Sequence, residues 1–155
     1  METETPRPVY IRPSGGRPSL ESLHGWESQY ERTLRWKDRV RKDKSLDTYL
    51  AFFLNCYALR DWLVAASIFE PAALDLSIQD DFALSLCRDI CNRSKHLVLN
   101  RPSVDANFFI CMEYNIVTRE PDMVVCAGGR VLEIGELTTA CIESWRRILA
   151  EKNLL

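Results

Sequence analysis

Residues 46–69 read LDTYLAFFLNCYALRDWLVAASIF, and this stretch decides the fold because it is apolar around most of a helical circumference. A helix with that pattern packs on several sides, which predicts a central, largely buried element. Ser45 is a suitable N-cap, and Pro71 is expected to stop the helix. Asn55 and Asp61 need partners, because buried polar groups require hydrogen bonds. Asn55 either bridges groups within the core or orients a functional group on another helix. Asp61 either pairs with a nearby arginine or orients that functional group.

Three further helices are predicted around this one. Apolar residues at helical spacing follow Ser19, a good N-cap, and predict a first helix from residue 19 or 20 to about 44. Residues 78–99 form the next helix, with two aspartates in its first turn that favour the positive end of the helix dipole. Residues 136–149 carry apolar side chains on one side and form the last helix. The proline-rich residues 1–18 are predicted to be a flexible tail.

Between the last two helices the hydrophobic period changes from helical to alternating. From residue 107 to residue 117 the even positions are apolar, which is typical of a strand with one covered face. Residues 123–127 and 130–134 flank Gly128-Gly129, a pair that favours a two-residue hairpin turn. Gly135 is expected to end the last strand. The pattern predicts a three-stranded antiparallel meander.

Length and composition are those of one globular domain. The chain has 155 residues, of which 46% are hydrophobic and 27% are charged, and a chain of this size can bury a sizeable core. We therefore expect a single domain over residues 19–155. Its fold is predicted to be α+β, mostly α: a four-helix bundle with the three-stranded meander at about 107–134, before the last helix.

Charge and cysteine usage limit the function classes. A net charge of −2 argues against a surface built wholly for nucleic acid, although a local basic patch stays possible. No apolar run could span a bilayer and none resembles a signal peptide, so we expect a cytoplasmic protein without membrane contact. The six cysteines form no C-x-x-C pair, and most lie among apolar neighbours, as buried thiols of reduced proteins do. Cys87 and Cys91 with His96 follow no standard zinc spacing, so we expect neither a metal nor a cofactor.

A basic segment lies in the second half of the predicted first helix. Residues 32–44 carry seven lysines and arginines against Asp38 and Asp43. They form either a solvated face with i,i+4 ion pairs or a stripe that faces RNA or phosphate. Trp36 within the segment either anchors the helix to the core or stacks on a base.

The strongest concentration of chemically active side chains is CRDICNRSKH, residues 87–96. On a helix, Asp89 and His96 lie about 20° apart and Asn92 lies about 40° from His96, so the three share one polar face. Histidine exchanges protons near physiological pH, and arginine binds phosphate through its planar fork. This face is either a functional site or a solvated helix surface.

The segment CRDICNRSKH, following FFLNCYALRDWL at residues 52–63, resembles small bacterial proteins that are similar to the HEPN superfamily. The resemblance covers about residues 46–99, with a weaker echo in the closing helix. It implies a helical bundle that usually dimerises, and in many members a metal-independent ribonuclease of toxin–antitoxin or antiphage systems. The superfamily signature is an arginine and a polar residue, then a histidine after about four to six intervening residues. Here seven residues separate Arg88 from His96.

On this resemblance, two copies of the chain place their arginines and histidines around one scissile phosphate. His96 acts as general acid or base, Arg88 stabilises the charge of the phosphorane, and Asp89 or Asn92 orients the groups. The implied partners are RNA, a second copy of the chain, and an antitoxin or another protein. The alternative is a non-catalytic bundle that dimerises or binds a protein partner. The candidate site residues are Arg88, Asp89, Asn92 and His96 for catalysis, and Arg93 and Lys95 for RNA binding.

Overall fold

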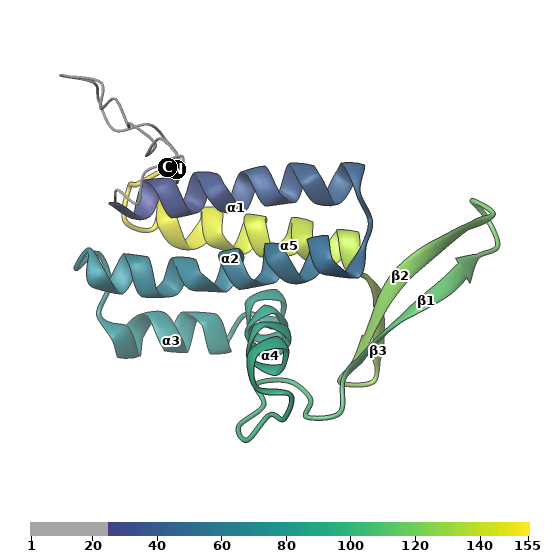
Figure 1. The fold of residues 1–155 in the computed structure, drawn as a ribbon. Coiled ribbons are helices and arrows are strands. Elements are labelled where there is room, and N and C mark those ends of the chain that lie inside the picture. Colours follow the sequence, from purple (N-terminus) through teal and green to yellow (C-terminus); the bar gives the residue numbers. More distant parts are fainter. Residues whose placement is uncertain (1–24) are drawn as a thin grey trace, which may run out of the picture.

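The computed structural model describes residues 25–155 (Figure 1). The predicted tail over residues 1–18 and the predicted start of the first helix lie outside this part of the chain. The described fold is α+β and mostly helical, with the three strands before the last helix, as predicted. Its elements are α1 (Gly25–Lys42), α2 (Leu46–Ala65), α3 (Pro71–Gln79), α4 (Phe82–His96), β1 (Phe109–Asn115), β2 (Glu120–Ala127), β3 (Arg130–Glu133) and α5 (Ile134–Ala150).

Helix α2 is the central helix, as its apolar sequence predicts. The Ser45 side chain caps it by accepting the Thr48 backbone N–H at 3.3 Å. The helix ends at Ala65, before the predicted end at residue 69, because the chain turns away at Ser67 with a φ of 56°. Five α2 side chains have no exposed surface: Phe52, Phe53, Cys56, Leu59 and Leu63.

The described chain has five helices rather than the predicted four. The added helix is α3, and the helix predicted over residues 78–99 is α4, which runs from Phe82 to His96. Pro71 occupies the first turn of α3, where its missing N–H costs no hydrogen bond. Asp80 then caps the end of α3. Asp81 starts α4 as its N-cap, accepting the Leu84 backbone N–H at 2.9 Å. The two aspartates predicted inside one first turn therefore separate two helices.

Helices α1, α2 and α5 lie alongside one another, and α4 crosses beneath α2 (Figure 1). The indole N–H of the fully buried Trp145 on α5 donates to the Cys56 backbone carbonyl of α2 at 3.1 Å. Gln29 of α1 donates to the Asn55 backbone carbonyl at 2.7 Å. Asp61 pairs with Arg60 at 2.9 Å. Asn55 thus bridges within the core and Asp61 pairs with a nearby arginine, which confirms the structural interpretation of both.

The three strands form an antiparallel sheet in the order β1-β2-β3, which confirms the meander. Gly128 and Gly129 make the predicted tight turn, both with positive φ. Strand β2 begins earlier than predicted and includes Pro121, which pairs with Tyr114 of β1. Strand β3 pairs only with residues 124–127 of β2. Pro121 therefore lies in a part of β2 that has no strand on its other side, where its missing N–H costs no ladder hydrogen bond.

The far half of the β1–β2 hairpin extends away from the helices (Figure 1). The alternating pattern predicted a strand here, and the strand is confirmed, but of its alternating apolar residues only Phe108, just before β1, is buried. Met112, Tyr114 and Ile116 are 57%, 63% and 84% exposed. These side chains are exposed because the bundle covers only the near end of the hairpin (Figure 1).

Helix α5 begins at Ile134, so Gly135 lies in its first turn and does not end the strand as predicted. The Gly135 carbonyl accepts the Thr138 hydroxyl at 2.7 Å within that turn. Among the helices of residues 25–155, none combines the length and the apolar character that a membrane crossing requires.

Candidate functional site

The polar cluster predicted from the sequence lies on α4 and on the turn that follows it. Helix α4 ends at His96, and the next residue, Leu97, has a φ of 63° and a ψ of −39°. The Val98 backbone N–H donates to the His96 carbonyl at 2.7 Å across Leu97. This is a three-residue γ-turn with positive φ, a rare and strained conformation for a non-glycine residue. The candidate histidine therefore lies at a sharp, strained helix end.

Asp89 is fully buried and holds the loop that joins α4 to β1. Its carboxylate accepts the backbone N–H of Ser103 at 2.7 Å, of Val104 at 2.7 Å and of Asp105 at 3.4 Å. Both oxygens are engaged, and none of the hydrogen bonds described for residues 25–155 joins Asp89 to His96. The expectation that Asp89 orients the catalytic groups is therefore corrected: its carboxylate anchors the loop.

Asp105, in the loop that Asp89 holds, hydrogen-bonds the turn between β2 and β3. Its carboxylate accepts the Asn107 backbone N–H at 2.8 Å and the Gly128 backbone N–H at 3.1 Å. These bonds hold the pKa of Asp105 below its usual value. Two successive aspartates thus connect α4, the loop and the β2–β3 turn.

Arg93 positions the start of the sheet. Its guanidinium donates to the Phe108 backbone carbonyl and lies over the Phe108 ring at 4.9 Å from the centroid. Arg93 was expected to bind RNA, but its side chain is half-buried and part of its donor capacity is used here. Lys95 is exposed, as an RNA-binding residue needs to be.

Besides the exposed Lys95, three of the predicted residues make no described hydrogen bond: Arg88, Asn92 and His96. They occupy positions i, i+4 and i+8 of α4 and so follow one another along the helix, and we call them the α4 ridge. Within residues 25–155 no described hydrogen bond involves their side chains, and the Nε of Arg88 is buried without a partner. Asn92 is half-buried and His96 is exposed. The ridge therefore combines a cation, an amide and an imidazole, and none of the three side chains has a described hydrogen-bond partner within residues 25–155.

Arg88 lies next to an acidic neighbour from α3. Asp75 accepts two bonds from Arg60, at 2.8 and 2.7 Å, and these bonds, with the charges of Arg60 and Arg88, hold the pKa of Asp75 below its usual value. The charge of Arg88 therefore reaches Asp75 on α3, although the two side chains form none of the described ion pairs. Eight residues of helix rise about 12 Å, so Arg88 and His96 of one chain lie at opposite ends of the ridge.

An apolar groove of about 470 Å³ lies on another side of α4, where the helix meets β1 and the start of α2. Its α4 residues are centred about 150° around the helix from the ridge. Leu97 at its edge is 80% exposed. The sequence patterns did not predict this groove, although the apolar run after His96 could have indicated it. The groove is lined by Leu46, Leu50, Ile90, Arg93, Ser94, Leu97, Phe108, Phe109 and Ile110.

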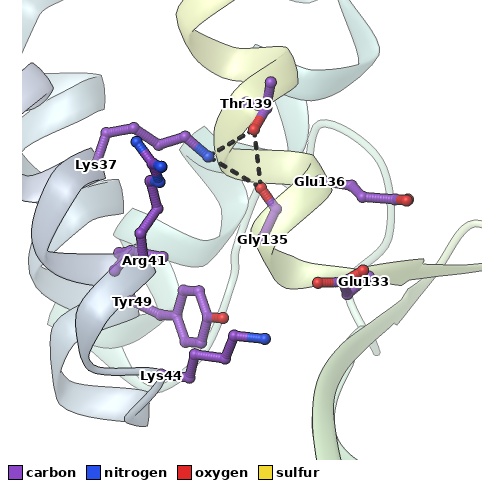
Figure 2. A pocket seen from close by; sticks show the side chains of 9 residues that line it. Lys37, Arg41, Lys44, Tyr49, Glu133, Gly135, Glu136 and Thr139 are labelled. Carbon is purple, nitrogen blue, oxygen red and sulfur yellow. Dashed lines mark hydrogen bonds between the residues drawn. The ribbon is translucent and has the colours of Figure 1, made fainter. Parts of the chain in front are cut away.

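A second cavity, of about 530 Å³, lies between the basic end of α1 and the start of α5 (Figure 2). Lys37 reaches across it to the Gly135 carbonyl at 3.2 Å and the Thr139 hydroxyl at 2.5 Å. Burial and the neighbouring Arg41 lower the pKa of Lys37. Glu133 and Glu136 also line the cavity, so its basic side chains face acidic ones and do not form a purely cationic site.

The rest of the basic segment agrees with a solvated face. Arg41 lies 3.8 Å from Asp38, and both side chains are exposed. Trp36 packs against the core, as the structural interpretation of that residue predicts, and Arg39 covers its ring at 4.5 Å.

Potential metal-ligating side chains gather in one place within the described chain, and that place is not the α4 ridge. Cys56, Cys87 and Cys141 lie within 4.8 Å of one another in the core. Cys87 therefore groups with thiols of α2 and α5, and not with Cys91 and His96.

The chain was compared with protein-family models, with curated proteins and with solved structures. None of the three comparisons found a significant match.

Proposed function

We propose that the protein is a dimeric, metal-independent ribonuclease of the HEPN-like type, which holds RNA between the α4 ridges of two copies. The observation that carries the proposal is the state of the ridge. Arg88, Asn92 and His96 lie along one face of α4 without hydrogen-bond partners in residues 25–155, whereas Asp89 and Arg93 beside them are engaged with the loop. The Nε of Arg88 makes no hydrogen bond within the described residues, and an arginine without a protein acceptor can turn its other N–H groups to a phosphate oxygen.

The chemistry requires a base, an acid and a group that stabilises anionic charge. His96 of one copy takes the proton of the ribose 2′-hydroxyl, and the 2′-oxygen attacks phosphorus. The bond from phosphorus to the 5′-oxygen breaks, and that oxygen takes a proton from water. Arg88 binds the non-bridging oxygens while their charge increases, and Asn92 hydrogen-bonds the phosphate or the imidazole. The products are a 2′,3′-cyclic phosphate and a 5′-hydroxyl.

A second copy is part of the proposal because one ridge is too long. The rise of about 12 Å between Arg88 and His96 exceeds what one phosphodiester spans. Long side chains on a helix also lean toward its N-terminus, which directs Arg88 away from His96 of the same chain. An antiparallel pair of α4 helices brings Arg88 of one copy close to His96 of the other.

The proposed place of action is the cytoplasm. All six cysteines are free thiols, and four of them are buried as small apolar groups. This usage suits a reducing compartment, where RNA is also present.

The experiment is an RNA cleavage assay in EDTA with the full chain. We expect cleavage that leaves 2′,3′-cyclic phosphate ends. The variants His96→Ala and Arg88→Ala should lose about 100-fold or more of the rate, because each removes a group that acts in the transition state. Matched controls are His24→Ala, which removes the other histidine of the chain, and Arg101→Ala, which removes an exposed arginine. Cleavage by the wild-type chain that persists in His96→Ala, with circular dichroism unchanged, contradicts the mechanism.

The apolar groove favours a second candidate function, a non-catalytic bundle that binds a protein. Leu97 and Phe109 at the groove are 80% and 54% exposed, and apolar side chains exposed together often mark a protein-binding surface. Because the groove lies about 150° around α4 from the ridge, a partner there leaves the ridge open.

Two variants, one in the groove and one on the ridge, distinguish the two candidate functions. Phe109→Asp places a charge in the groove, so it should abolish partner binding or self-association measured by analytical ultracentrifugation, and leave RNA binding in place. Asn92→Ala should weaken RNA binding and leave partner binding or self-association at the groove in place. Unchanged association in Phe109→Asp removes the support for the second candidate.

A further inference from the structure

Three cysteines from three helices meet in the centre of the bundle. Cys56 on α2, Cys87 on α4 and Cys141 on α5 have no exposed surface, and their sulfur atoms all lie within 4.8 Å of one another. Three sulfurs bound at about 2.3 Å to one ion lie about 4 Å apart, so small side-chain rotations suffice to bring these thiols to ligating distance. The geometry points to a three-thiol site for a trivalent, thiol-seeking ion such as arsenic(III).

Hydrogen bonds between the helices hold the three thiols in place. The Cys87 thiol of α4 donates to the Phe53 carbonyl of α2 at 3.6 Å, and the Cys141 thiol of α5 donates to the Ala83 carbonyl of α4 at 3.4 Å. The Trp145 indole of α5 donates to the Cys56 carbonyl of α2 at 3.1 Å. These three bonds connect α2, α4 and α5 in a closed cycle, so the thiols are fixed by the packing of the bundle and not by a single turn of chain.

Burial raises the pKa of Cys87 and of Cys141 well above the usual value, because a thiolate is costly in an apolar core. A bound ion removes this cost only if it neutralises the charge of the thiolates.

Charge decides which ion suits the site. Three thiolates carry three negative charges, so a copper(I) complex has a net charge of −2, a zinc complex −1 and an arsenic(III) complex zero. Burial of net charge in an apolar core is strongly unfavourable. Soft thiolate ligands favour all of these ions over hard ones. The neutral trivalent complex is therefore the one that this core accommodates best.

The binding reaction balances without an oxidant. Arsenous acid exchanges its three hydroxides for the three sulfurs, and three As–S bonds replace three As–O bonds. The three hydroxides leave as water with the protons of the three thiols. No electron is transferred.

Entry to the site requires the helices to separate locally. Since the sulfurs are fully buried, binding takes place from transiently opened forms and should be slow. Low concentrations of urea populate those forms and should accelerate binding.

The test is native mass spectrometry of the full, reduced chain after incubation with arsenite. A three-thiol complex adds one arsenic with the loss of three waters, whereas a two-thiol complex retains one oxygen. We expect the first mass, together with a higher melting temperature. Cys56→Ala, Cys87→Ala and Cys141→Ala should each lower the affinity by about 100-fold or more, because each removes one arm of the chelate.

The chain offers two matched controls. Cys111 on β1 and Cys126 on β2 lie close enough to interact and form a possible two-thiol site, so the double variant Cys111→Ser/Cys126→Ser is the first control. Cys91→Ala is the second, because Cys91 is a buried thiol of α4 outside the cluster. Both should bind arsenic like the wild-type chain. If arsenite binding is lost in Cys111→Ser/Cys126→Ser and persists in Cys56→Ala, the assignment to the core cluster is overturned.

A measurement on the wild-type chain covers the case in which a core variant does not fold. Alkylation in urea, followed by peptide mapping, should show Cys56, Cys87 and Cys141 protected by arsenite, and Cys91 unprotected. Absence of this protection overturns the proposal. Copper(I) and zinc are titrated separately, and binding of either one at the cluster in place of arsenite overturns the assignment of a trivalent ion.

Discussion

The Asp89 carboxylate on α4 accepts the backbone N–H of Val104 at 2.7 Å, across a loop that carries the chain from the helix to the sheet. The residue predicted to belong to the catalytic group thus builds the loop beside it. Two neighbouring rows of side chains on α4 have different roles. Asp89 and Arg93 hydrogen-bond the loop and the start of β1, whereas the side chains of Arg88, Asn92 and His96 make no described hydrogen bond. The proposed function depends on this division.

Removal of the Asp89 carboxylate should destabilise the fold. Asp89→Ala leaves two close backbone N–H groups without their charged acceptor in a buried place, and we expect a loss of about 3 kcal/mol in the free energy of unfolding. Urea unfolding followed by circular dichroism measures it. The control Asn92→Ala, on the same helix, should change stability by less than about 0.5 kcal/mol. Equal effects of the two variants contradict the assigned division of roles.

Leu97 should be replaceable by glycine with a gain in stability. Its φ of 63° is strained for a residue with a Cβ atom, and its side chain is 80% exposed, so little burial is lost. We expect Leu97→Gly to raise the free energy of unfolding by about 1 kcal/mol. Val98→Gly, at an exposed neighbour with ordinary φ, serves as the control and should not stabilise. A destabilised Leu97→Gly variant shows that the Leu97 side chain contributes to packing at the groove.

Stability at alkaline pH should depend on Tyr49. Burial, with the nearby Glu133 and Asp122, raises the pKa of Tyr49 to about 12. Between about pH 10 and pH 12 the unfolded chain loses the phenolic proton and the folded chain keeps it, so the free energy of unfolding falls as pH rises. Tyr49→Phe removes this contribution. The fall should become shallower without vanishing, because burial also raises the pKa of Tyr57.

Urea titrations at several pH values in this range measure the effect on both chains. Parallel pH profiles for the wild-type chain and Tyr49→Phe show that the Tyr49 hydroxyl ionises as readily in the folded state as in the unfolded one.

The sequence predicts the helices well where apolar residues recur around a long segment. Helix α2, its Ser45 cap and the Gly128-Gly129 turn follow from local chemistry, and all three are confirmed. The separate helix α3 was missed because the break between α3 and α4, at Asp80 and Asp81, contains no glycine or proline to mark it. The break there depends on Asp81, whose second oxygen accepts bonds from Ser144 and Arg147 of α5. Such a contact between distant residues leaves no local pattern.

Contacts between distant residues also explain why the candidate site was predicted only in part. A helical wheel correctly places Asp89, Asn92 and His96 on the polar arc of α4, but it does not include the loop that covers Asp89. The exposure of Met112 and Tyr114 was also beyond prediction, because alternation indicates a strand and not where the bundle ends. Long-range contacts decide which polar residues are structural and which remain free.

The central claim is that two copies of α4 share one RNA-cleaving site, and mixing two inactive variants tests it most directly. Arg88→Ala and His96→Ala chains are each inactive alone in the proposed mechanism. After mixing and exchange of subunits, the mixed dimer holds one Arg88 and one His96 from different chains, and metal-independent cleavage should return in proportion to the mixed dimer seen by native mass spectrometry. A mixed dimer that forms and does not cleave RNA contradicts the shared site.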